Sequence, residues 1–203
     1  MPVADPNRYR ILILFAHPAY DKSRVNRRLF EAAWGLEGVR LHDLYEAYPD
    51  FHIDIKREQA LLLEHDLLVF QHPFYWYSSP ALLKEWMDLV LEHGWSYGRN
   101  GRALAGKYLL SAVTTGGPEQ AYRVGGNNRF PMRQYLLPFD QTAHLCKMKY
   151  LAPYTVHAAL TLESGGDLEA QAAHWRRTLE ALRDGKIDLE AAAAADRLNP
   201  LVP

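Results

Sequence analysis

The sequence predicts an α/β fold, a five-stranded parallel sheet of strand order 2-1-3-4-5 with helices on both faces. Five short runs rich in β-branched and aromatic residues alternate with longer segments of helical spacing, and no internal repeat divides the chain. Strands that alternate with helices pair in parallel through right-handed crossovers. For five such strands, 2-1-3-4-5 is a common order.

The first half of the chain supplies three of these strands. Residues 11–16 form an apolar run typical of a buried strand, whereas Val25, Leu29 and Ala33 recur at the spacing of a helix. Pro80 is expected in the first turn of a helix, where its missing N–H costs nothing. We expect strands at residues 11–16, 39–44 and 66–71, helices at 23–34, 56–65 and 81–92, and a polar, aromatic connection at 45–55.

The second half begins with a glycine-rich crossover at residues 94–106. We expect strands at 108–113 and 154–160, a helical segment at 131–147 that Pro138 interrupts, and a helix at 168–183 that Gly185 ends. Residues 1–185 are predicted to form one domain. The Ala-rich tail 186–203 is predicted to hold a short helix, 189–198, on the surface or against a partner subunit.

Charge and cysteine content exclude several classes of protein. Lys plus Arg number 23 and Asp plus Glu number 24, so no net field favours nucleic acid. The single cysteine, Cys146, excludes an intrachain disulfide and fits a reducing cytoplasm. No apolar run approaches the ~20 residues of a membrane span, and the N-terminal residues lack the apolar core of a signal peptide. We therefore expect a cytoplasmic protein.

Three distinctive loops follow strands one, three and four of the predicted sheet. They read HPAYDKSRVN, HPFYWYSSP and TTGG. The carboxyl ends of parallel strands share one edge, and with this order the three strands are neighbours. The loops are therefore expected to meet at the switch point between strands one and three, where ligands bind in open α/β sheets.

The first loop opens a helix at residues 23–26. Free backbone N–H groups at a helix start favour an anion, Ser23 and Asn26 can add donors, and Arg24 can add charge. An equally simple alternative is that Ser23 only caps the helix. The loop is neither a P-loop nor a dinucleotide fingerprint, because GxxxxGK[ST] and GxGxxG are both absent from it.

The other two loops suit a flat ligand. Four consecutive aromatics, Phe74 to Tyr77, cannot all face one core; Tyr75 and Trp76 are better placed for a ligand, and Phe74 and Tyr77 for packing. The TTGG loop allows close backbone approach and adds two hydroxyls, although TTGG is also a plausible turn. A planar, phosphorylated heterocycle fits these features. Flavin mononucleotide (FMN) fits better than a nucleoside triphosphate, since no Mg²⁺-binding carboxylate lies in these loops.

Other candidate sites are weaker. Asp50, His52 and Asp54 alternate as metal ligands do, but a solvated loop explains them better, so no metal site is expected. Cys146 is expected to be a buried thiol. The remaining histidines are read as structural or surface residues, namely His65, His93, His144, His157 and His174.

These motifs resemble a known family. AHP followed by SRVN, the stretch QHPFYWYSSPALLKEWMD, and TTGG with Tyr122 beyond it resemble the flavodoxin-like NAD(P)H:quinone oxidoreductases, the DT-diaphorase group. Three further stretches are similar to one branch, the ancillary flavoproteins of the glutathione-gated potassium-efflux (Kef) systems. They are DLYEAYPDFHIDIKREQALL, LAGKY and RFPMRQYLLPFDQTAHLCKM.

The resemblance implies a flavodoxin-like fold, bound FMN, a homodimer, and ping-pong transfer of two electrons from NADH or NADPH to a quinone. It implies that Tyr122 assists hydride transfer and that the partner histidine's position falls at Asn127 or Asn128. Asparagine donates hydrogen bonds but cannot carry a proton near neutral pH. The implied FMN contacts are His17, Ser23, Arg24, Val25, Asn26, Phe74, Tyr75, Trp76, Tyr77, Thr114, Thr115, Gly116 and Gly117.

Two functions follow from the resemblance. The first is an FMN-dependent NAD(P)H:quinone oxidoreductase. The alternative is a regulatory ancillary subunit of a glutathione-gated potassium-efflux antiporter, held at the inner face of the membrane by that partner. Because one protein can perform both roles, they do not exclude each other.

Overall fold

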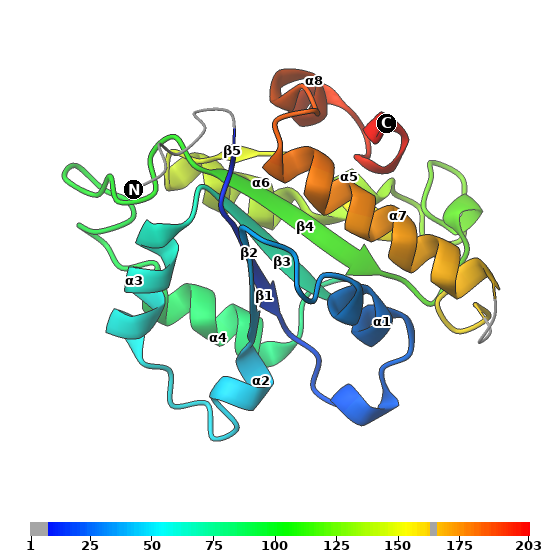
Figure 1. Cartoon of the computed structure of the whole chain (residues 1–203), viewed down its shortest axis with the longest axis horizontal. Coiled ribbons are helices and arrows are strands. Elements are labelled where there is room, and N and C mark those ends of the chain that lie inside the picture. The colour runs from blue at the N-terminus through cyan, green and yellow to red at the C-terminus, as the bar shows by residue number, and fades with distance from the viewer. Residues whose placement is uncertain (1–7, 163–165) are drawn as a thin grey trace.

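The computed structural model describes residues 8–162 and 166–203 and is organised around one parallel sheet (Figure 1). The strand order is β2-β1-β3-β4-β5, and β6 also pairs with β4, which confirms the predicted order. The strands are β1 (Ile11–Phe15), β2 (Val39–Asp43), β3 (Leu67–Pro73), β4 (Tyr108–Thr114), β5 (Lys149–Tyr150) and β6 (Tyr154–Val156).

The fifth position of the sheet is filled by two short strands rather than one. β5 pairs with the start of β4 and β6 with its end. Between them, Pro153 has no N–H to donate, and the Ala152 N–H donates to Ala192 O in the C-terminal tail at 2.9 Å. The predicted strand 154–160 is thus only three residues long, because the chain leaves β4 after Val156.

Helices cover both faces of the sheet, as predicted (Figure 1). α1, α7 and α8 pack on one face, and α3, α4 and α6 on the other. The helices are α1 (Val25–Ala32), α2 (Leu44–Ala47), α3 (Ile55–Glu64), α4 (Ala81–Val90), α5 (Met132–Tyr135), α6 (Leu137–Leu145), α7 (Gly166–Arg183) and α8 (Leu189–Ala194), with 3₁₀ turns at Tyr20–Lys22, Glu119–Ala121 and Asn199–Leu201.

Two helical regions differ from the prediction. The connection after β2 contains α2, because the Asp43 carboxylate accepts from the N–H groups of Tyr45 and Glu46 and starts a turn. The segment 131–147 is two helices that meet at Leu136, and Pro138 lies in the first turn of the second. Pro80 precedes α4 as its N-cap residue.

The tail is packed rather than loose. Leu189, Ala192 and Leu198 are buried in the same core as α1 and α7. Its helix ends at Ala194, four residues earlier than predicted. The boundary at residue 185 stays a prediction. Among the described residues, no helix combines the length and apolar character that crossing a membrane requires.

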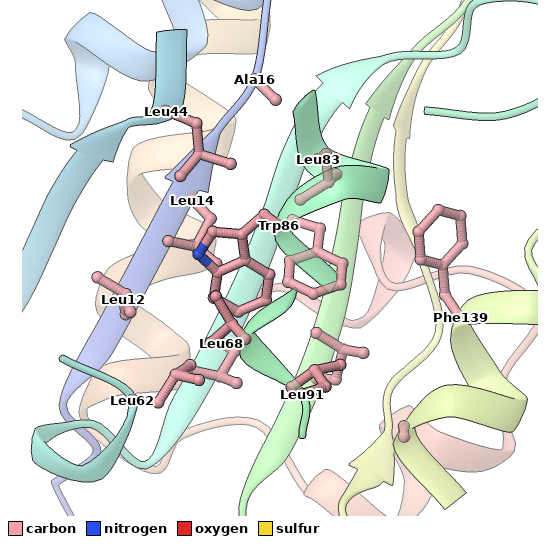
Figure 2. Packing of buried hydrophobic residues seen from close by; sticks show 14 of the residues in the cluster. Leu12, Leu14, Ala16, Leu44, Leu62, Leu68, Leu83, Trp86, Leu91 and Phe139 are labelled. Atoms are coloured by element: carbon pink, nitrogen blue, oxygen red, sulfur yellow. The ribbon is translucent and has the colours of Figure 1, made fainter. Parts of the chain in front are cut away.

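The sheet divides the core into two halves, and the side chains of β1 contribute alternately to each. Successive strand side chains point to opposite faces, so Ile11 and Ile13 pack against α1 and α7, while Leu12 and Leu14 pack against α3 and α4. Figure 2 shows the second half, in which Trp86 of α4 lies among leucines from both the sheet and the helices.

A buried carboxylate fixes the turn between β2 and α3. Glu58 is fully buried and accepts hydrogen bonds from His42 Nε2 at 2.8 Å, Tyr48 hydroxyl at 2.6 Å and Trp86 Nε1 at 2.8 Å. Burial by itself would raise the pKa of Glu58, but these donors outweigh it and hold that pKa below its ordinary value. The network joins β2, α3 and α4.

Candidate functional site

The three predicted loops line one cavity of about 320 Å³ at the carboxyl edge of β1, β3 and β4. Segments from three distant parts of the sequence therefore meet where they were expected to. The loop after β6 forms the remaining wall, which the sequence did not indicate. The lining residues are His17, Lys22, Ser23, Arg24, Val25, Asn26, Pro73, Phe74, Tyr75, Thr114, Thr115, Gly116, Ala159 and Leu160.

The start of α1 makes one end of the cavity favourable for an anion. The first N–H groups of a helix have no intrahelical acceptor, and Lys22 and Arg24 add positive charge beside them. Ser23 is buried, and its Oγ accepts from the Arg27 N–H at 3.0 Å, so it satisfies one N–H of the first turn although Arg24 is the N-cap residue. Its hydroxyl proton still remains for a ligand. The two interpretations of Ser23 are therefore compatible.

Three buried polar side chains are hydrogen-bonded to one another at the anion-favouring end of the cavity. The Asn26 side-chain amide donates to the Thr114 hydroxyl at 3.0 Å, and Gln71 Nε2 donates to Asn26 O and Oδ1 at 2.9 and 3.0 Å. These hydrogen bonds join α1, β3 and β4 at the wall of the cavity, which Asn26 and Thr114 line. Gln71 was not singled out from the sequence; the available signal was an amide that directly follows the apolar run Leu67–Phe70, and the structure buries it fully.

The aromatic loop forms a tight turn closed by the Ser78 N–H, which donates to Tyr75 O at 3.0 Å. Its central residues, Trp76 and Tyr77, have φ of 50° and 63°, a left-handed conformation that costs bulky residues about 1–3 kcal/mol each. Phe74 is buried and Tyr75 lines the cavity, whereas Trp76 is 93% exposed and, like Tyr77, lies outside the lining.

His17 links the first loop to the aromatic loop. Its Nδ1 accepts from the Ala19 N–H at 3.2 Å, so the neutral ring carries its proton on Nε2, 3.3 Å from the Tyr75 hydroxyl. Burial lowers the pKa of His17, which keeps the ring neutral near pH 7. His17 thus orients Tyr75 over the cavity and adds no charge to it.

The TTGG loop is held by the segment that follows β6. Thr115 N–H donates to Val156 O at 2.9 Å, and Ala159 N–H donates back to Thr115 O at 2.8 Å. A Cβ at Gly116 would lie 3.2 Å from Leu160 Cδ1, and one at Gly117 would lie 3.4 Å from the Tyr122 ring. Gly116 therefore permits a closer approach than a side chain would, whereas a Cβ at Gly117 would make an ordinary contact. Gly117 is outside the lining.

Tyr122, Asn127 and Asn128 lie beside the cavity but not in its wall. Tyr122 packs against Gly117 and belongs to a cluster of rings in which Tyr135 contacts Phe74, Tyr77, Tyr122 and Phe130. Burial raises the pKa of Tyr122, so its hydroxyl keeps its proton. Asn128 Oδ1 lies 3.4 Å from the Tyr77 hydroxyl, and Asn127 is exposed.

His157 is a residue that sequence reasoning missed. It follows β6, and its Nδ1 lies 2.9 Å from the Thr115 hydroxyl. Its ring lies 5.3 Å from that of Tyr122. The sequence offered no local signal for this, because the partners are far apart in the chain. The structure thus places a histidine beside Tyr122, although the resemblance put asparagines, Asn127 or Asn128, at the position of the family's histidine.

Other predicted and possible sites carry less chemistry. Asp50 and Asp54 each accept from a nearby backbone N–H, and the described residues include no group of three metal-ligating side chains. A larger cavity, about 550 Å³, lies at the opposite edge of the sheet. Its cations are already engaged, since Lys149 pairs with Glu190 and Arg133 donates to backbone carbonyls of the tail.

A sequence family defined by the flavodoxin-like fold matches residues 9–179. This chain belongs to that family. Among its relatives, the glutathione-regulated potassium-efflux system ancillary protein KefG of Pectobacterium atrosepticum is 54% identical over 154 residues, 76% of this chain and 84% of the relative.

Two solved structures are also similar to this chain. General stress protein 14 of Treponema denticola, in complex with FMN, is 36% identical with a TM-score of 0.79, and the match covers 85% of this chain and 99% of that one. An NADPH-quinone reductase from P. pentosaceus is 32% identical with a TM-score of 0.75, covering 83% and 96% of the two chains.

Proposed function

We propose that this protein is an FMN-dependent NAD(P)H:quinone oxidoreductase. The observation that carries the proposal is the cavity itself, in which a cationic helix start, an aromatic turn and a glycine-containing hydroxyl loop face one space. These three features match the phosphate, the ring faces and the polar ring edge of FMN. The relatives support it, since one was solved with FMN and another is named an NADPH-quinone reductase.

The residues present fit the cofactor. The N–H groups at Val25 and Asn26, the Ser23 hydroxyl and the Arg24 guanidinium would hold the phosphate. Three or four charge-assisted hydrogen bonds of about 1.5–3 kcal/mol each cover the ~8 kcal/mol of a micromolar site. Tyr75, Thr115 and Gly116 would hold the ring, and the tight turn at Trp76 and Tyr77 fixes the position of Tyr75.

When bound, FMN would supply the two-electron chemistry, accepting hydride from NADH or NADPH and passing it to a quinone. The chain's own residues bind and orient. Buried Asn26 and Thr114 hold the two loops at a fixed separation, and neutral His17 positions Tyr75. The protonated Tyr122 hydroxyl, near Thr115 and Gly117, can donate to a developing oxyanion.

The protein is proposed to act as a homodimer. Tyr75 and Leu160 line the cavity and are exposed. Trp76 and Tyr77 follow Tyr75 and are exposed too, as is Phe130, which contacts the ring of Tyr135, as Tyr77 does. An apolar patch at the rim of a site is typical of a surface that a partner covers. A second copy laid on this patch would complete the ring pocket.

The test is spectroscopic. We expect the protein, loaded with FMN, to be yellow and to lose that colour anaerobically when NADH or NADPH is added, and to regain it with menadione. A protein that rejects added FMN would remove the proposal. Comparing NADH with NADPH in the same experiment identifies the preferred donor.

A second function, regulation of a Kef-type potassium-efflux antiporter from the cytoplasmic side, is supported by the 54% identity to a KefG ancillary protein. We expect the chain to co-purify with such an antiporter and to change potassium efflux when its gene is deleted. Absence of both effects in a host that carries the antiporter would exclude it. The two functions are compatible.

A further inference from the structure

A second cavity of about 420 Å³ lies on the far side of the loop that follows β6. It is lined by β6, α7 and the tail, and it contains His157, His174, Glu119 and Arg197. Thr115 lines the first cavity and His157 lines the second. Because the Thr115 hydroxyl and His157 Nδ1 are 2.9 Å apart, their contact bridges the wall between the two cavities.

The hydrogen bonds around Thr115 fix the tautomer of His157. Thr115 Oγ1 also lies 2.9 Å from Gly117 O, which can only accept. The hydroxyl therefore donates to Gly117, and its lone pair accepts from Nδ1–H of His157. In the neutral ring this leaves Nε2 unprotonated, so it can take a proton from solvent, to which the half-buried side chain has access.

We infer that Thr115 and His157 form a proton relay that connects the reaction site to solvent through the second cavity. The inference rests on the proposed function, whose net reaction consumes a proton: NAD(P)H, a quinone and one proton give NAD(P)⁺ and a hydroquinone, and two electrons move with the hydride. The relay would supply that proton while a substrate closes the open mouth of the first cavity.

Each transfer balances within the relay. His157 takes a proton from water at Nε2 and passes its Nδ1 proton to Thr115 Oγ1, and the original hydroxyl proton moves to the quinone oxygen. Exchange of the imidazole with water then restores the Nδ1–H form. His157 touches no reacting atom, so it is a positioning residue that also carries a proton.

Electrostatics around His157 suit this role. Burial lowers the pKa of His157, so the ring is neutral near pH 7 and free to accept. The negative charge of Glu119 raises the pKa of His157, and the positive charge of Arg197 lowers it. Glu119 and Arg197 form an ion pair at 2.5 Å in the same cavity. His174 and Tyr122 are the other titratable groups facing this region, and His174 Nδ1 is engaged by the Tyr154 hydroxyl at 3.0 Å.

The test compares two acceptors. Menadione needs a proton when it is reduced, whereas ferricyanide takes only electrons. In His157→Gln the ratio of the menadione rate to the ferricyanide rate should fall about tenfold. This is less than general acid catalysis usually contributes, because water can still reach the site and supply some protons. The ratio should also lose its dependence on pH between 5 and 7. His174→Gln, in the same cavity but without contact to Thr115, should keep the wild-type ratio.

A second readout needs no cofactor. Nitrogen-15 NMR of the FMN-free protein should show His157 protonated on Nδ1 at pH 7.5, and an Nε2–H ring would overturn the relay. An unchanged ratio in His157→Gln, with wild-type protein oxidising NAD(P)H normally, would also overturn it. If wild type oxidises no NAD(P)H with either acceptor, the proposed function fails instead, and with it the relay's role.

Discussion

The side-chain amide of Asn26 donates a hydrogen bond to the hydroxyl of Thr114, 3.0 Å away, although the two residues are 88 positions apart in the sequence. This contact ties the helix start proposed to bind phosphate to the loop proposed to bind the flavin ring. Both side chains are buried, so water cannot replace either partner. The shape of the site depends on this bond.

Removing the Asn26 amide should therefore weaken both the fold and the site. In Asn26→Ala, Thr114 and Gln71 lose their buried partner, and we expect the free energy of unfolding to fall by about 1–3 kcal/mol and the Kd for FMN to rise about tenfold. Urea unfolding and quenching of FMN fluorescence measure the two effects. Asn100→Ala, an exposed loop change, is the control. Unaltered FMN affinity in Asn26→Ala would contradict this.

Arg24 donates to Leu162 O at 3.0 Å, and its remaining N–H groups are expected to act on the phosphate. Arg24→Ala should raise the Kd for FMN about tenfold, leave the Kd for riboflavin unchanged, and reduce the salt dependence of FMN binding. Arg27 is the matched control, because it lies on the same helix and pairs with Glu31 away from the cavity. Equal losses for FMN and riboflavin would show that Arg24 supports the loop and not the phosphate.

The Glu58 network should be visible in stability. Glu58→Gln turns one acceptor into a donor facing His42, Tyr48 or Trp86, so we expect a loss of about 2–4 kcal/mol in unfolding free energy. Glu64→Gln, an exposed change at the end of the same helix, should cost nothing measurable.

The same carboxylate sets a dependence on pH. The pKa of Glu58 is lower in the folded than in the unfolded protein. Ionised Glu58 therefore contributes its full share of the unfolding free energy above the pKa of the unfolded protein, about 4.3. That share is lost as pH falls through the pKa of the folded protein. Urea midpoints measured from pH 6 to pH 3 should therefore fall more steeply in wild type than in Glu58→Gln. Parallel curves would count against an ionised Glu58.

Trp76 should matter for assembly. If a second copy covers the exposed aromatic patch, Trp76→Ala should shift the protein towards monomer in sedimentation velocity, by about tenfold or more in the dimer dissociation constant. Trp34→Ala removes another exposed tryptophan, at the end of α1 and away from the cavity, and should leave the dimer intact. A wild-type protein that sediments as a monomer would refute the dimer.

The order of the strands could be predicted because alternation of strands and helices is a local pattern. What could not be predicted depends on distant partners. The fifth strand is split because Ala152 donates to Ala192 in the tail, and no periodicity near residue 152 reports that bond. The cap at Asp43 was in the sequence, but it coincides with a strand end, which hid α2.

In the candidate site, too, local sequence patterns predicted some residues, while others depend on distant contacts. The three loops were identifiable from composition and from their position after strands, so the lining at Ser23, Tyr75 and Thr115 was predicted. Gln71 and His157 were not, because their roles come from contacts with Asn26 and Thr115 across the fold. An amide or a histidine has no local signature for such a contact.

The most direct test of the account is a crystal structure of the protein with FMN. We predict one FMN per chain, its phosphate against the backbone of residues 23–26 and its ring between Tyr75 and Thr115. A structure in which FMN lies elsewhere, or in which this cavity stays empty at saturating FMN, would contradict the account.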